Sequence, residues 1–116
     1  MKEILIFAGT TEGRELSEYL AVAGIAHTLC VATEYGEIVL KEHPLVKVHK
    51  GRMNQEEIEV YIKAGNFGAV VDATHPYAEV VTQNIKNAMQ DMDIPYLRLK
   101  RENSVSSNYE KIQYFK

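Results

Sequence analysis

Short apolar segments alternate with amphipathic segments along almost the whole chain, and this alternation constrains the fold more than any other feature. The segment Glu3–Phe7 is almost wholly apolar, which is typical of a strand buried on both faces of a parallel sheet. After a loop, Leu16, Leu20 and Ala23 recur at helical spacing, and Gly24 can end that helix. The first 24 residues therefore predict one strand followed by one packed helix.

The same pattern recurs along the chain. Asn54 and Glu57 have the spacing of a helix capping box, Gly65 can end that helix, and Pro76 suits the first turn of the next one. A short apolar helix is expected before Lys41. Further strands are expected at residues 27–32, 46–49, 69–72 and 95–99. By the right-handed crossover rule, these units predict an α/β fold with a doubly wound, Rossmann-like parallel sheet of about five strands in the order 3-2-1-4-5.

The last residues differ from this pattern. Residues 104–108 are a polar break, and Ile112–Phe115 is an apolar strand candidate. We expect a Rossmann-like domain over residues 1–102, followed by a linker and strand over 103–116 that lead toward a second domain. Because an exposed apolar strand invites pairing with another chain, we expect Ile112–Phe115 to be disordered or paired across a subunit contact, as in a swapped homodimer.

Composition excludes several functional classes. The 116 residues are 46% hydrophobic and 25% charged, as in an ordinary globular domain, and the formal net charge of −3 argues against nucleic-acid or anionic-membrane binding. The apolar run at residues 4–8 is too short for a signal peptide or a membrane span, so we expect a cytoplasmic protein. Cys30 lies in an apolar run and is expected in the core. No metal site is expected, because ligand-like spacing is absent among His27, His43, His49 and His75.

The loops that follow the strands are the expected binding positions, because ligands of open parallel sheets bind beyond the carboxyl ends of the strands. The loop after the first strand carries two glycines and two hydroxyls before a helix whose free N–H groups can hold a phosphate. Its spacing is G-x-x-x-G, without a Walker lysine, so P-loop hydrolysis is not expected. The alternative is an ordinary strand–helix turn capped by Thr10 or Thr11.

Three further loops carry polar residues. Thr33 and Glu34 follow the second strand, where an acidic residue often binds the ribose of a dinucleotide; a solvated turn is the alternative. Arg52 follows the third strand, and Arg98 and Arg101 add positive charge at the fifth. These cations could bind an acidic ligand or merely be solvated.

The segment after the fourth strand, D-A-T-H-P-Y-A, is unusually polar for its position. Thr74 or His75 can cap a helix and Pro76 can start it, which leaves Asp72 and His75 less well explained. In the order 3-2-1-4-5, the loops after strands one and four flank one crevice. We therefore expect Asp72 to hold the turn by accepting backbone or hydroxyl bonds and His75 to face a ligand. A helix cap with a solvent-facing histidine is the alternative.

Taken together, these motifs resemble the precorrin-6A reductases, including the cobalt-precorrin-6A reductases of the anaerobic cobalamin pathway. The resemblance covers residues 4 to about 102. It is carried, in chain order, by GTTEGR at 9–14, VATEYG at 31–36, HKGRM at 49–53, DATHPYA at 72–78 and PYLRLKR at 95–101.

The resemblance implies NADPH-dependent reduction of one double bond of precorrin-6A to give precorrin-6B, in a cleft between two Rossmann-like domains. The chain is then similar to the N-terminal half, and a C-terminal domain would complete it. The residues expected to hold NADPH are Gly9, Thr10, Thr11, Glu12, Gly13, Thr33 and Glu34. Those expected to bind the tetrapyrrole and its carboxylates are Arg14, Arg52, Thr74, His75, Pro76, Tyr77, Arg98 and Arg101. The expected catalytic residues are His75, which could orient the macrocycle or lend a proton, and Asp72.

Two other classes stay open at the level of sequence. One is a stand-alone nucleotide-binding or sensing module without catalysis. The other is a flavodoxin-like or receiver-like signalling domain, although the first loop lacks the clustered acids that a receiver needs. A strand order that places strand three next to strand one would favour the second class.

Overall fold

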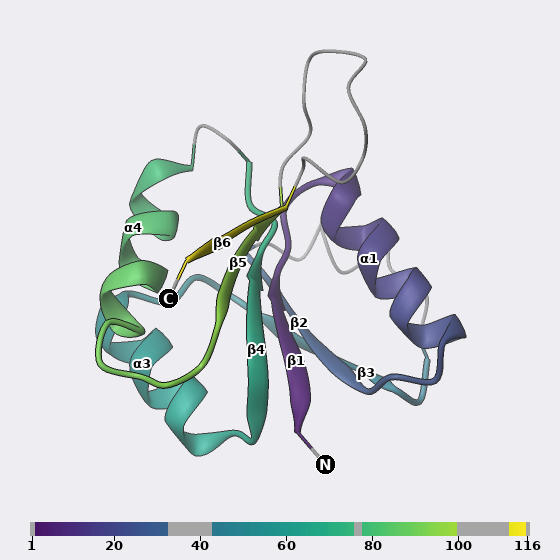
Figure 1. The fold of residues 1–116 in the computed structure, drawn as a ribbon. Coiled ribbons are helices and arrows are strands. Elements are labelled where there is room, and N and C mark those ends of the chain that lie inside the picture. Colours follow the sequence, from purple (N-terminus) through teal and green to yellow (C-terminus); the bar gives the residue numbers. More distant parts are fainter. Residues whose placement is uncertain (1, 33–42, 76–77, 100–111, 116) are drawn as a thin grey trace.

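The chain folds around one mixed sheet, and the computed structural model describes residues 2–32, 43–75, 78–99 and 112–115. Figure 1 shows the arrangement of its elements. In chain order they are β1 (Glu3–Phe7), α1 (Thr11–Val22), β2 (His27–Val31), β3 (Val46–Lys50), α3 (Gln55–Ala64), β4 (Phe67–Asp72), α4 (Glu79–Ala88), β5 (Tyr96–Leu99) and β6 (Ile112–Phe115). The short helix predicted before Lys41 lies outside the described residues.

The sheet has the order β3-β2-β1-β4-β5-β6, and its first five strands are parallel. β1 lies between β2 and β4, with Phe7 paired to Cys30 on one side and to Asp72 on the other. The predicted order 3-2-1-4-5 is therefore confirmed. Because β1, β2 and β4 end at the same level, the loops that follow them begin side by side.

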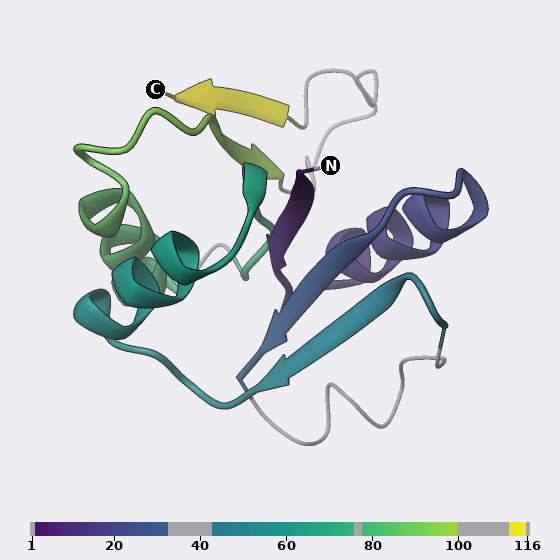
Figure 2. The same cartoon turned by 90° about the horizontal axis from the view of Figure 1, so that it is seen from below.

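Helices cover both faces of the sheet: α1 lies on one face, and α3 and α4 lie together on the other (Figures 1 and 2). Side chains along β1 alternate between the two faces of the sheet and therefore contribute to the cores on both faces. Leu5 and Phe7 belong to the core under α3 and α4, whereas Ile6 packs with Leu20 in the core under α1. A strand with apolar residues at successive positions is thus buried on both faces, as its sequence predicts.

Local sequence signals set the ends of two helices. The side chain of Asn54 accepts from the N–H of Glu57, and the side chain of Glu57 accepts from the N–H of Asn54, each at 2.8 Å. This confirms the capping box of α3, which Gly65 caps at its other end. Gly24 follows α1 with φ +78°, a conformation that costs glycine little and other residues more.

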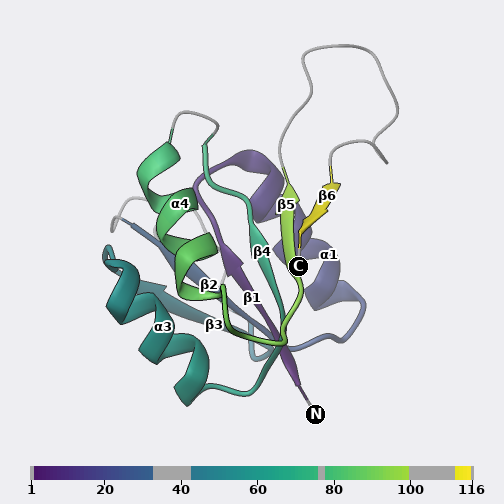
Figure 3. The same ribbon diagram turned by 60° about the vertical axis from the view of Figure 1, so that its left-hand side comes forward.

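Two predictions about the secondary structure are wrong, one for the last strand and one for the start of α4. β6 pairs antiparallel with β5 of the same chain, Leu97 opposite Tyr114, instead of being disordered or paired with a second copy (Figure 3). The free edge of β5 needs hydrogen-bond partners, and a segment of the same chain supplies them. α4 begins at Glu79 with Ala78 as its N-cap, so neither Thr74 nor His75 caps it. The reason lies in the turn that precedes this helix.

Candidate functional site

The turns that follow β1 and β4 are bonded to each other. The hydroxyl of Thr10 donates to the carbonyl of Ala73 at 2.7 Å and also accepts from the N–H of Gly13 at 3.3 Å. Thr10 is the N-cap of α1, so one side chain both starts the helix and ties it to β4. The N–H of Ala73 donates to the carbonyl of Phe7 at 2.8 Å. The predicted meeting of these two turns at one edge of the sheet is confirmed.

Glycines allow this close approach. A Cβ atom on Gly13 would lie 3.0 Å from the Cβ of Ala73 and 3.3 Å from that of Ala8, which is tighter than normal packing. A Cβ on Gly9 would lie 3.7 Å from the Cα of Thr74, in ordinary contact. Gly13 therefore has a packing role between α1 and the sheet, whereas Gly9 keeps space free between the turns.

Asp72 is the centre of a buried hydrogen-bond network, with no exposed surface. Its Oδ1 accepts from the N–H of Thr74 at 3.1 Å and from the Thr74 hydroxyl at 2.6 Å. Its Oδ2 accepts from the hydroxyls of Thr82 at 2.7 Å and Tyr96 at 2.6 Å. The expectation that Asp72 accepts backbone and hydroxyl bonds is confirmed. Thr74 donates to Asp72 through both its N–H and its hydroxyl, so its side chain belongs to the turn after β4 and makes no cap hydrogen bond to α4.

Arg98 closes the same network from β5. Its Nη1 donates to the carbonyls of Asp72 at 3.0 Å and Thr74 at 2.9 Å, and it lies 3.3 Å from Oδ1 of Asp72. Arg98 is buried, so its charge is balanced inside the protein by the carboxylate. Burial and the hydrogen bond to Asp72 raise the pKa of Tyr96, which stays protonated and donates to the carboxylate. The network fixes the backbone from β4 to Thr74.

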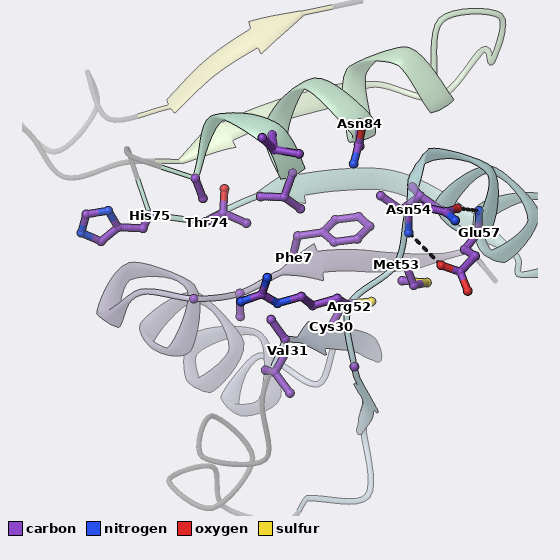
Figure 4. Close-up of a pocket in the computed structure, with 18 of the residues that line it drawn as sticks. Phe7, Cys30, Val31, Arg52, Met53, Asn54, Glu57, Thr74, His75 and Asn84 are labelled. Atoms are coloured by element: carbon purple, nitrogen blue, oxygen red, sulfur yellow. Dashed lines mark hydrogen bonds between the residues drawn. The ribbon is translucent and has the colours of Figure 1, made fainter.

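A pocket of about 700 Å³ opens beside these turns, between α3 and α4 at the carboxyl ends of the strands (Figure 4). Its size is within the usual range for small-molecule sites. Phe7, Ile58 and Val81 supply apolar lining from β1, α3 and α4. The β1 and β4 turns reach it through Gly9 and Thr74.

Polar groups line the same pocket. Arg52 is exposed, and its side chain extends along the pocket in Figure 4. Gly51, just before it, has φ +109°, and its N–H donates to the carbonyl of Val31 at 2.9 Å. The amide of Asn84 points from α4 into the pocket (Figure 4). Glu57 lies at the start of α3, so the pocket carries both signs of charge.

Cys30 also lines the pocket but is 5% exposed. Burial raises the pKa of its thiol to about 12. A thiol with this pKa is almost fully protonated at neutral pH, and only the thiolate is a strong nucleophile. Cys30 therefore acts as a core residue, as its sequence context predicts.

The predicted site residues fall into three groups. Those that line the pocket are Gly9, Arg52, Thr74 and His75. Those described but not lining it are Thr10, Thr11, Glu12, Gly13 and Arg14 at the start of α1, and Asp72 and Arg98 in the buried network. Those outside the described residues are Thr33, Glu34, Pro76, Tyr77 and Arg101.

The placement of Arg98 differs from the picture that the sequence suggests. Arg98 was expected at a substrate-binding rim, but it points into the protein and holds the turn. His75 is exposed, and its ring lies at the edge of the pocket, directed away from Phe7 (Figure 4). Arg98 is buried because Asp72 lies opposite it in the sheet register, a pairing that spans 26 residues of sequence.

Sequence reasoning missed the α3 and α4 walls of the pocket. Asn54 and Glu57 have the signal of a capping box, which gives no reason to expect a binding surface. Asn84 is a polar residue one position before the buried Ile85, on a helix otherwise recognised by its apolar face. The packing of α3 against α4 brings these residues to one pocket.

Among the described residues, no group of three or more His, Cys, Asp and Glu side chains could hold a metal ion. None of the helices in this part of the chain is long and apolar enough to cross a membrane.

Comparison with known proteins identifies relatives along almost the whole chain. Residues 3–116 match the family "Precorrin-6x reductase CbiJ/CobK". A cobalt-precorrin-6A reductase of Priestia megaterium is 37% identical over 84% of this chain, and one of Salmonella typhimurium is 30% identical over 97%. A precorrin-6A reductase of Mycobacterium tuberculosis is 30% identical over 87%.

The fold has a solved counterpart. The structure of a CobK precorrin-6A reductase superposes with a TM-score of 0.76 at 21% identity, covering 92% of this chain and 41% of that one. Matches to the three curated relatives likewise cover 38%, 42% and 40% of their lengths. The chain thus spans about two fifths of the proteins it matches.

Proposed function

The chain belongs to the CbiJ/CobK precorrin-6x reductase family, and from that premise we propose that it serves NADPH-dependent reduction of one double bond of precorrin-6A, or its cobalt form, to give precorrin-6B in cobalamin biosynthesis. The observation that carries the proposal is the family match over residues 3–116. The meeting of the turns after β1 and β4 beside a pocket supports it, because ligands of such sheets bind at this edge.

The described residues of the turn after β1 are suited to binding a dinucleotide. Gly9 leaves the space between the two turns open, and Thr10 starts α1 so that its first N–H groups face the carboxyl edge of the sheet. In the proposal, residues 9–13 hold the diphosphate, and Thr33 and Glu34 bind near the adenosine ribose. NADPH, when bound, supplies the hydride.

The tetrapyrrole carries several carboxylates, and the exposed Arg14 at the start of α1 is a suitable partner for one of them. Thr74 and His75 are proposed to contact the macrocycle, with His75 orienting it or lending a proton. Pro76, Tyr77 and Arg101 are proposed to extend the same contact. Asp72 and Arg98 act as positioning residues, because their charges are engaged within the protein.

The proposal can be tested with a chimaera in which this chain replaces the matching segment of the Priestia megaterium reductase. We expect NADPH oxidation that requires precorrin-6A or cobalt-precorrin-6A, each assayed separately. The variant His75→Ala should lower turnover about tenfold or more and leave the melting temperature unchanged, because the side chain is exposed. His43→Ala, an exposed histidine outside the pocket, is the matched control.

Two results would count against the proposal. A chimaera that binds nucleotide without tetrapyrrole-dependent oxidation, while the Priestia megaterium protein is active, would favour the nucleotide-sensing alternative. If the chimaera is active and His75→Ala has the same turnover as His43→Ala, His75 has no role in the reaction.

A further inference from the structure

The start of α4 is held to the sheet by a residue inside the helix. Its N-cap is Ala78, whose methyl group cannot accept a hydrogen bond from the first N–H groups of the helix. One turn further on, the hydroxyl of Thr82 donates to Oδ2 of Asp72 at 2.7 Å. A threonine inside a helix commonly directs its hydroxyl to solvent or to the carbonyl four residues earlier. The hydroxyl of Thr82 instead joins α4 to the end of β4.

We propose that Thr82 is a positioning residue, which docks the start of α4 on the turn after β4 and thereby holds His75 in place for the reduction. The inference rests on the proposed function, because it takes His75 as a contact of the macrocycle. His75 lies on the lining of the pocket and Thr82 does not, so Thr82 acts through the turn and not on a ligand.

Three hydrogen bonds connect Asp72 to His75 by way of α4. The N–H of Ala78 donates to the carbonyl of His75 at 2.8 Å, and the N–H of Thr82 donates to the carbonyl of Ala78 at 3.2 Å. The hydroxyl of Thr82 then bonds Asp72. Together with the backbone from Asp72 to His75, these bonds form a closed ring. The backbone of His75 is therefore held from the helix as well as from the strand.

Thr74 belongs to the same ring and sets its width. The hydroxyls of Thr74 and Thr82 lie 3.2 Å apart. Each can donate its single proton to a different oxygen of Asp72, Thr74 to Oδ1 at 2.6 Å and Thr82 to Oδ2 at 2.7 Å. One carboxylate thus holds the turn and the helix at a fixed separation.

The carboxylate of Asp72 keeps its other partners when the Thr82 hydroxyl is removed. Its Oδ2 still accepts from Tyr96 at 2.6 Å, and its Oδ1 still accepts from Thr74 and faces Arg98. Loss of the Thr82 hydroxyl therefore leaves no buried charge unpaired, in contrast to loss of the carboxylate. The change should loosen the start of α4 while the sheet stays folded.

The experiment compares Thr82→Val, which keeps the shape of the side chain, with Thr82→Ser, which keeps the hydroxyl, in the chimaera. The kcat of Thr82→Val should fall about fivefold or more, and the KM of NADPH and of the tetrapyrrole should change less than about twofold, because misplacement acts on the transition state. Thr82→Ser should retain kcat. Gln83→Leu, which removes an exposed bond to Asn87 on the same helix, is the control.

A double variant tests whether Thr82 acts through His75. In a chimaera that carries His75→Ala, Thr82→Val should lower kcat by less than about twofold more, because the group that it positions is already gone. Thermal melting shows that each variant is folded. If Thr82→Val does not fold, Thr82→Ala removes the same hydroxyl from a position where alanine favours the helix.

Amide hydrogen exchange of the 116-residue chain, followed by NMR, gives a readout that does not depend on activity. In Thr82→Val, exchange of the Ala78 N–H should accelerate about fivefold or more, which is the scale of one lost hydrogen bond. Exchange of the Met89 N–H, which donates to Ile85 at the other end of α4, should change less than about twofold. Equal acceleration of the two amides would show general destabilisation.

The inference is overturned if Thr82→Val leaves kcat unchanged in an active chimaera, if Thr82→Ser is as slow as Thr82→Val, or if the losses at Thr82 and His75 are fully additive. Equal exchange at Ala78 and Met89 would overturn it as well. Faster exchange confined to Ala78, in a chain whose chimaera shows no turnover, would overturn the reductase proposal and support the docking of α4 by Thr82.

Discussion

Removing the carboxylate of Asp72 should destabilise the fold more than any change at the exposed site residues. In Asp72→Ala, the guanidinium of Arg98 loses its buried counter-charge, and the hydroxyls of Tyr96 and Thr82 lose an acceptor. Asp72→Asn keeps the shape and one carbonyl oxygen but removes the charge. The alanine variant should therefore be the less stable of the two.

The expected loss of stability follows from the burial of the Asp72–Arg98 ion pair. Breaking a buried ion pair by removing one partner costs about 3 to 5 kcal/mol, because the other charge is left uncompensated. This is a large part of the roughly 5 to 15 kcal/mol that stabilises a typical domain. At about 4 °C per kcal/mol for a chain of this size, the melting temperature of Asp72→Ala should fall by roughly 12 to 20 °C.

The assay is urea unfolding of the 116-residue chain followed by circular dichroism, with thermal melting in parallel. Asp91→Asn removes an exposed carboxylate and should change the free energy of unfolding by less than about 0.5 kcal/mol. Arg98→Met tests the other partner, and the double variant should lose less than the sum of the two single losses, because neither charge is then left alone.

One result would refute the reasoning directly. If the free energy of unfolding of Asp72→Ala lies within about 0.5 kcal/mol of that of the unmodified chain, the network does not hold the turn after β4. Strict additivity of the Asp72 and Arg98 variants would show that the 3.3 Å contact between them contributes no coupling.

Three further predictions concern the packing and ionisation of buried groups. Gly13→Ala should destabilise the fold by about 1 to 3 kcal/mol in urea unfolding, because its Cβ would lie 3.0 Å from Ala73, whereas Gly9→Ala should cost less; equal losses would contradict the packing role. Cys30 should react slowly with a thiol reagent at pH 8 in the native state and rapidly in urea, since its pKa is raised to about 12; fast native labelling would contradict its burial. Stability should fall as the pH rises above about 10, because the unfolded chain then loses the Tyr96 proton that the folded chain retains. Tyr96→Phe should flatten that decline, and an unchanged slope would show that Tyr96 does not contribute to it.

Within the described residues, the sequence by itself determined the strands and helices from β1 to β5, most of their ends and the order of the parallel strands. The capping box of Asn54 and Glu57 and the glycine after α1 are local signals, because the bonding groups lie within a few residues of each other. Strand order follows from the apolar character of β1 and β4 and from the handedness of the crossovers, both of which are properties of the chain before it packs. The same reasoning placed the turns after β1 and β4 side by side.

Only the tertiary structure decided which polar groups face a ligand and which face each other. Arg98 and Arg52 are both arginines near the ends of strands, yet one is buried against Asp72 and the other extends along the pocket. The contacts that separate them join residues far apart in sequence, such as Thr10 with Ala73 and Asp72 with Arg98. Such contacts depend on strand register and on the packing of α3 against α4, which residue type and spacing do not encode locally. The pairing of β6 with β5 has the same origin, because the partner of an edge strand is settled by which segment reaches that edge.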